Sequence, residues 1–104
     1  SSTWEVALYQ DGNVDKTEEF FMYSIDFLEN GYIKVTDPNN GIIDGSWLSY
    51  RSEGLFLAMH YGIEAPFDVL NHRWRIVEID ETRIELRDYS YTGAVERILV
   101  LESK

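Results

Sequence analysis

The two histidines of the chain, His60 and His72, are the first residues whose types suggest metal chemistry. Imidazole is a common metal ligand, and Glu64 and Asp68 lie between them as candidate carboxylate ligands. The histidines lack the i, i+4 spacing of a helical metal site, and the chain has no cysteine that could complete a thiolate site. We therefore expect ordinary strand-end and loop histidines and predict no metal site.

Catalysis by a serine nucleophile is the second chemistry that the residue types allow. Ser46, His60 and Asp68 supply the side chains of a Ser-His-Asp triad. No serine lies in a Gly-x-Ser-x-Gly nucleophile elbow, however, and carboxylates are so frequent that none stands out as a general acid. The sequence thus predicts a protein that is not an enzyme and needs no cofactor.

The charge of the chain argues against several classes of partner. Its 104 residues include 19 acidic and 9 basic side chains, which gives a net charge of −10. Such a chain repels nucleic-acid phosphates, and it has no run of Lys or Arg that could dock on an anionic membrane. It also lacks an apolar stretch long enough to insert into a bilayer. Its length and its 44% hydrophobic residues predict one domain, residues 1–104, folded as a monomer.

The segments that must position these side chains alternate apolar and polar residues, which is typical of half-buried strands. Turn residues such as Glu29-Asn30-Gly31 separate the segments. Eight strands are predicted, at residues 3–10, 19–28, 32–36, 42–51, 55–61, 73–79, 83–89 and 95–102. Between the fifth and sixth strands the alternation stops, and residues 65–71 are predicted to form at most one short helical turn.

Short connections between consecutive strands favour an antiparallel meander, and closing the sheet removes its exposed edges. We therefore predict an all-β fold, an eight-stranded antiparallel up-and-down barrel, with an open β-sandwich as the alternative. The alternation predicts two inward-facing sets, one on the first strand and one on the second. They are Trp4, Val6 and Leu8, and Phe21, Tyr23, Ile25 and Phe27.

Three strands begin or centre on a tryptophan, and we expect Trp4, Trp47 and Trp74 to plug the ends of a small barrel. Gly45 indicates a bulge, a bend or the close approach of a large neighbour, so Trp47 is expected to pack over it or over a gap on an adjacent strand. Glu78 shares the parity of Trp74, and a bulge that turns its carboxylate outward is favoured over burial beside an arginine or lysine.

A series of strand and turn signatures runs along nearly the whole chain. They are "TWEVALYQDGNVDKTEEF", Y-x-I-D-F-x-x-N-G at 23–31, "DGSW" at 44–47, "LNHRW" at 70–74 and I-E-L-R-D at 84–88. Together they resemble a family of small lipocalin-like domains from exported or lipid-anchored envelope proteins of Gram-negative bacteria. The resemblance implies an eight-stranded barrel, export to the periplasm or cell envelope, and a non-enzymatic role.

The chain departs from the lipocalin pattern in two places. Lipocalins have a Gly-x-Trp motif on the first strand, but here Ser2 stands two residues before Trp4 in place of the glycine. The Gly-x-Trp of this chain, Gly45 to Trp47, lies on the fourth predicted strand. Lipocalins also pack an arginine of the last strand over that tryptophan, and Arg97 is several residues out of the register that this contact needs. The transfer of a lipocalin ligand site to this chain is therefore not supported by these motifs.

Two functions are open for such a barrel. The first is binding of a small apolar or aromatic molecule at one mouth, under the segment 62–71, by Tyr23, Trp47, His60, Tyr61, Phe67 and Trp74. The second is a structural or protein-interaction module of the envelope, with exposed tyrosines such as Tyr89 and Tyr91 at the contact. An enclosed cavity of about 300 Å³ or more would favour the first, and a packed lumen beside an exposed apolar patch the second.

Overall fold

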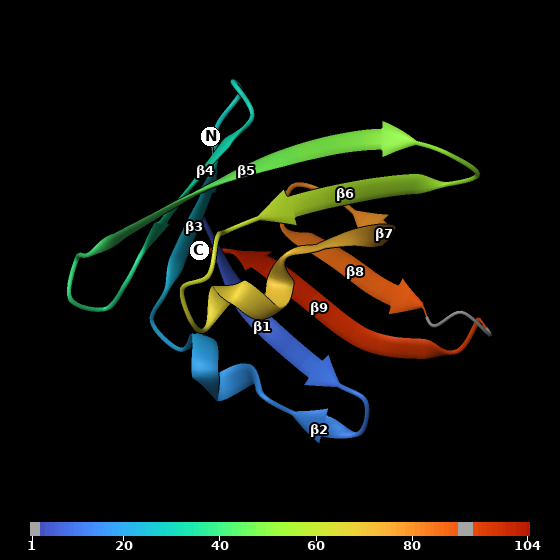
Figure 1. Cartoon of the computed structure of the whole chain (residues 1–104), viewed down its shortest axis with the longest axis horizontal. Helices are drawn as coiled ribbons and strands as arrows, with labels where there is room; N and C mark the ends of the chain where they lie inside the picture. Colours follow the sequence, from blue (N-terminus) through green and yellow to red (C-terminus); the bar gives the residue numbers. More distant parts are fainter. Residues whose placement is uncertain (1–2, 90–92) are drawn as a thin grey trace.

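The alternating segments of the sequence form strands in the computed structural model, which describes residues 3–89 and 93–104 (Figure 1). The strands are β1 (Thr3–Asp11), β2 (Val14–Asp15), β3 (Ser24–Phe27), β4 (Tyr32–Thr36), β5 (Ile42–Arg51), β6 (Leu55–His60), β7 (His72–Ile79), β8 (Arg83–Tyr89) and β9 (Val95–Ser103). Two 3-10 turns, η1 (Thr17–Phe20) and η2 (Phe67–Leu70), lie between strands. Within these described residues, no helix is long and apolar enough to cross a membrane.

Eight of these strands close into an antiparallel barrel. Each strand from β3 to β9 pairs with the next, β3 also pairs with β1, and β1 pairs with β9. The β1–β9 register runs from Trp4 opposite Ser103 to Asp11 opposite Arg97, so Arg97 lies far from Trp4 along the barrel wall. β2 only adds a two-residue ribbon to the end of β1. The predicted barrel is therefore confirmed, since the open sandwich would leave the first and last strands unpaired.

The second predicted strand is wrong over its first half. Residues 17–20 form η1, and the strand itself covers only Ser24–Phe27. The Asp15 carboxylate accepts hydrogen bonds from the backbone N–H and the hydroxyl of Thr17, and these local bonds start a turn where a strand would continue. At this turn the predicted parity fails, so that Phe20 is buried and Phe21 is 73% exposed. Beyond it, Ile25 is buried and Tyr23 and Phe27 pack against the core, as predicted. η2, by contrast, is the helical turn predicted for 65–71.

Two β-bulges decide which side chains face inward. A bulge between Val6 and Leu8 shifts the alternation of β1, so that Tyr9 is buried in place of the predicted Leu8. A second bulge, on β7, places Glu78 on the outside, where its carboxylate lies 3.0 Å from Arg83 Nη1. The predicted outward position of Glu78 is therefore confirmed.

Two glycines are required by the backbone around them. Gly31 has a φ of +87° in the predicted hairpin turn between β3 and β4. At Gly45 a β-carbon would overlap the carbonyl oxygen of His60 and would touch Tyr61. The close approach predicted at Gly45 is therefore made by the end of β6 and by Tyr61. Trp47 meets Phe27 of β3 edge-on, with ring centroids 6.2 Å apart.

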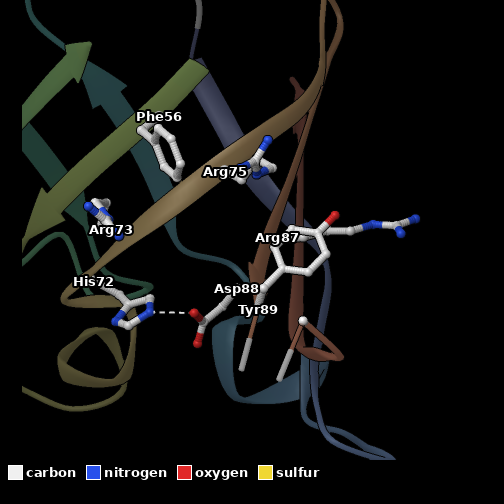
Figure 2. A pocket seen from close by; sticks show the side chains of 8 residues that line it. Phe56, His72, Arg73, Arg75, Arg87, Asp88 and Tyr89 are labelled. Atoms are coloured by element: carbon white, nitrogen blue, oxygen red, sulfur yellow. Dashed lines mark hydrogen bonds and ion pairs between the residues drawn. The ribbon is translucent and has the colours of Figure 1, made fainter. Parts of the chain in front are cut away.

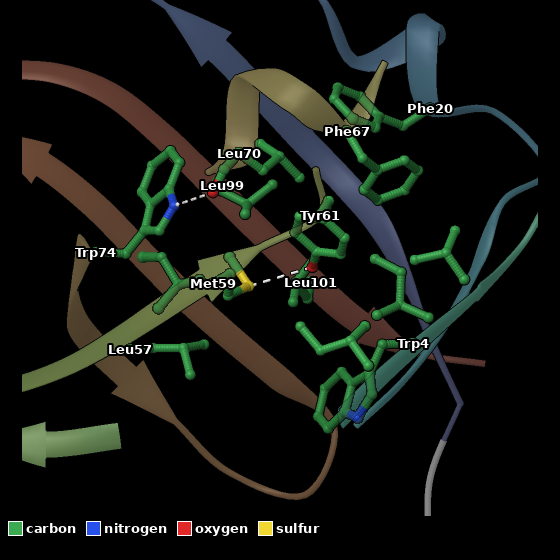
Figure 3. Packing of buried hydrophobic residues seen from close by; sticks show 14 of the residues in the cluster. Trp4, Phe20, Leu57, Met59, Tyr61, Phe67, Leu70, Trp74, Leu99 and Leu101 are labelled. Carbon is green, nitrogen blue, oxygen red and sulfur yellow. Dashed lines mark hydrogen bonds between the residues drawn. The ribbon is translucent and has the colours of Figure 1, made fainter. Parts of the chain in front are cut away.

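The lumen of the barrel is filled by apolar side chains (Figure 3). Strands from all sides contribute to one buried cluster, and the two turns add Phe20, Phe67 and Leu70 to it. Trp74, on β7, is 0% exposed, and its indole N–H donates to the carbonyl of Leu70 at 3.2 Å. Trp4 is buried in the same cluster, and Trp47 packs partly buried against it.

Candidate anion-binding site

The six residues predicted to line a mouth of the barrel fall into two groups. Tyr61, Phe67 and Trp74 are buried in the core, and Tyr23 packs its ring edge-on against Phe67 at 5.2 Å. The other two, Trp47 and His60, lie on β5 and β6 beside a shallow hollow of about 160 Å³. The binding role of these six residues stays a prediction, and all of them except His60 lie in the core or pack against it.

The polar atoms of the core all have partners. The buried hydroxyl of Tyr61 lies 3.3 Å from the sulfur of Met59, and burial raises the pKa of Tyr61 well above its usual value. Across the described part of the chain, no buried side-chain nitrogen or oxygen lacks a hydrogen-bond partner. The fully buried polar side-chain atoms of the described residues are therefore already engaged within the protein.

The two histidines do not come together with the carboxylates considered for a metal site. In residues 3–89 and 93–104, no group of three or more His, Asp or Glu side chains is placed to hold an ion. His60 is exposed on the rim of the shallow hollow. His72 instead bonds Asp88, a residue that the sequence reasoning did not select.

A larger hollow, of about 670 Å³, lies between β7 and β8 (Figure 2). We call it the arginine slot, and it is lined by Phe56, His72, Arg73, Arg75, Arg87, Asp88, Tyr89 and Gly93. The ladder between β7 and β8 ends at the pair Arg75–Arg87, although both strands continue beyond it. The slot occupies this interruption of the wall, and it opens to the outside of the barrel.

The floor of the slot is a hydrogen bond that joins the two strands where the ladder has ended. His72 Nε2 lies 2.6 Å from Asp88 Oδ1, and the Asp88 side chain is only 9% exposed. Arg97 Nη1 lies 3.8 Å from the other Asp88 oxygen, so a cation balances this carboxylate. The imidazole of His72 also meets the indole of Trp74 edge-on at 5.8 Å, which ties the slot to the core.

One wall of the slot is an aromatic ring that holds two guanidinium groups. Phe56 stands opposite Arg75 in the register, and the Cζ atoms of Arg73 and Arg75 both lie 5.0 Å from its ring centroid. Tyr50, its partner on β5, stacks on the same ring at 5.5 Å. Tyr89 adds a second ring 5.7 Å from Arg75 Cζ. Cation–π contacts at exposed positions contribute about 0.5–1 kcal/mol each, so they favour conformations in which both guanidinium groups lie close to this ring.

The ion pairs around the slot leave two positive charges unbalanced. Arg87 Nη2 lies 2.8 Å from Glu85, and Figure 2 shows its guanidinium directed away from Arg73 and Arg75. Neither Arg73 nor Arg75 has a carboxylate oxygen within 4.0 Å among the described residues; Arg75 reaches only the carbonyl of Glu53, at 3.4 Å. What distinguishes these two arginines is that both guanidinium groups lie against the same aromatic ring.

The alternation around Trp74 contained the signal for this site. In "HRWR", residues 72–75, an inward Trp74 places Arg73 and Arg75 together on the outer face. The prediction from this parity concerns the tryptophan and the inward or outward position of Glu78, and does not include the two arginines. The contribution of Phe56 and Tyr89 has no such signal, because only the strand register and the end of the β7–β8 ladder bring them to the arginines.

No protein-family model, no curated protein and no solved structure gives a significant match to this chain.

Proposed function

We propose that this protein is a non-enzymatic binding domain that holds a negatively charged ligand at the arginine slot, on the outside of its barrel. The observation that carries the proposal is the pair Arg73 and Arg75, which both lie against the Phe56 ring and have no carboxylate partner in the described chain. Guanidinium groups donate paired hydrogen bonds to carboxylates and phosphates. A bound anion would neutralise the guanidinium charges of Arg73 and Arg75.

Binding in the lumen has less support. A neutral apolar ligand at the mouth would have to displace rings that already contact one another, such as Phe67 with Phe20, Tyr23 and Tyr61 at 5.0–5.2 Å. Such contacts are lost only at a free-energy cost that the ligand would have to offset. Export to the periplasm or envelope remains part of the proposal on the resemblance to lipocalin-like domains alone.

A protein-interaction module is the second candidate. It is favoured by the filled lumen together with large apolar side chains on the surface, including Phe21, Leu48 and Ile63, which is 94% exposed. Tyr89, predicted at such a contact, is 39% exposed in the slot, and Tyr91 lies outside the described residues. The two candidates are compatible if the anionic ligand is part of another protein.

A titration with two isosteric molecules tests the proposed function. We expect benzoate, but not neutral benzamide, to shift the NMR signals of Phe56, Arg73, Arg75 and Tyr89, and the shift to weaken as salt is added. Arg75→Gln should abolish it, while Lys34→Gln, which removes the same charge from the outer face of β4, should not. Equal binding of both molecules, or shifts centred on Phe67 and Trp74, would refute the outer site.

A further inference from the structure

We infer that the arginine slot recognises an extended acidic peptide segment that carries carboxylates two residues apart. This inference rests on the proposed function and adds to it the spacing and the class of the ligand. It follows from the positions of Arg73 and Arg75 on the outer face of β7, and from the burial of Trp74 between them.

Arg73 and Arg75 are two separate charges held at the spacing of a strand. They occupy positions i and i+2 of β7, and the residue between them, Trp74, is fully buried on the opposite face. A strand rises about 3.3 Å per residue, so their backbones are about 6.6 Å apart on one face. The Cζ atoms of both guanidinium groups lie 5.0 Å from the centroid of the same Phe56 ring, so the two charges sit beside one another at this part of the outer wall.

An extended peptide reproduces this spacing on its own side chains. Residues i and i+2 of an extended segment point to the same side and are separated by the same two-residue rise. Two such carboxylates would each meet one guanidinium, whereas a single carboxylate would leave one arginine unbalanced. In a helix, residues two apart do not face the same way, so a helical acidic segment would not match.

The surroundings of the slot also favour an acidic segment over other occupants. The hollow measures about 670 Å³ and opens on the outer wall, so a chain can pass across it without entering the barrel. The Phe56 ring already contacts the stacked ring of Tyr50 and both guanidinium groups, so it has little surface left on which a ligand ring could stack. Two guanidinium groups against one ring make this part of the outer wall locally positive, so it complements an acidic segment although the whole chain carries a net charge of −10.

Peptides of one composition and different spacing test the inference. We would titrate the labelled protein at low ionic strength with three heptapeptides, each with two glutamates among five strand-forming threonines. The glutamates stand one, two or three positions apart. We expect the peptide with its glutamates two positions apart to bind most tightly. Its affinity should fall about tenfold when either glutamate becomes glutamine.

Variants of the protein assign the effect to the two arginines. Arg73→Gln and Arg75→Gln should each abolish the difference between the two-glutamate peptide and its one-glutamate version. Lys34→Gln, on the outer face of β4, should preserve that difference. An unchanged thermal midpoint of each variant shows that the loss is not unfolding.

The outcomes separate the inference from the proposed function. If benzoate binds but the three spacings bind equally, the inference is wrong and the anion site stands. If glutarate, a small dicarboxylate, binds more tightly than the peptide with its glutamates two positions apart, the ligand is a small molecule and the inference is wrong. If neither benzoate nor any peptide binds, both proposals are wrong. Sedimentation that shows self-association through the slot would make a second copy the occupant and would also overturn the inference.

Discussion

Two aromatic clusters of this barrel use the same residue types for opposite purposes. The inner cluster, Tyr9, Phe20, Tyr23, Tyr61, Phe67 and Trp74, lies in the filled lumen (Figure 3). The outer cluster, Tyr50, Phe56 and Tyr89, lies on the outside of β5, β6 and β8. Inner rings meet one another edge-on, as Phe20 meets Phe67 at 5.2 Å. Outer rings meet guanidinium groups, as Phe56 meets Arg73 and Arg75.

The difference teaches that the neighbours of a ring, and not its type, decide whether it can serve a ligand. In the inner cluster the rings pack mainly against other apolar side chains, so the cluster contributes stability. In the outer cluster the rings contact charged groups at the surface, where an anion can reach them. His72 connects the two, since it lies edge-on to Trp74 and bonds Asp88 at the floor of the slot.

The largest expected effect comes from removing one ring of each cluster. Trp74→Ala should lower the free energy of unfolding by about 3–5 kcal/mol, because it empties a fully buried site. Phe56→Ala should cost only about 1–2 kcal/mol, the scale of its stacking and cation–π contacts. Urea unfolding monitored by circular dichroism measures both. Equal losses would mean that the two clusters do not differ in the way described.

The loss of folding free energy at alkaline pH should depend on the buried tyrosines of the inner cluster. Burial raises the pKa of Tyr61, and burial also raises that of Tyr9, although the charge of Arg97 lowers it in part. Their folded-state pKa values exceed the unfolded one, so this stability is complete below about pH 10 and is lost as the pH rises above it. Tyr61→Phe should reduce the loss by up to about 1.4 kcal/mol per pH unit.

Unfolding midpoints in urea between pH 8 and about pH 11 check this expectation. Tyr32→Phe, which removes a hydroxyl from an exposed tyrosine of β4, is the matched control. A Tyr61→Phe protein that loses stability above pH 10 as steeply as the original chain would contradict the burial of that hydroxyl.

The smallest expected effect lies at the turn that separates an inner ring from an exposed one. Met22 follows buried Phe20 and exposed Phe21, and it has a φ of +70°, which side chains other than glycine rarely adopt. Met22→Gly should therefore raise the free energy of unfolding by about 0.5–1 kcal/mol, as the relief of strain exceeds the added chain entropy. Met22→Ala, which keeps the strain, is the control, and a glycine variant no more stable than the alanine one would argue against this turn.

Much of the fold could be predicted because alternation and turn residues are local. The ranges predicted for β4, β5 and β8 match the structure, and short connections between strands led to the closed barrel. The errors fall where a local hydrogen bond or a single extra residue competes with alternation. Asp15 and Thr17 start a turn in place of a strand, and the bulge after Val6 exchanges Leu8 for Tyr9.

The candidate site shows where prediction from the sequence ends. The sequence by itself determined that Arg73 and Arg75 lie on the face opposite Trp74, because side chains alternate along any strand. Only the tertiary structure decided that Phe56 contacts both of them and that Tyr89 lies beside Arg75. Those neighbours depend on the register of β6 with β7 and on where the β7–β8 ladder ends. Register follows from the packing of the whole lumen, and no local stretch of the chain contains it.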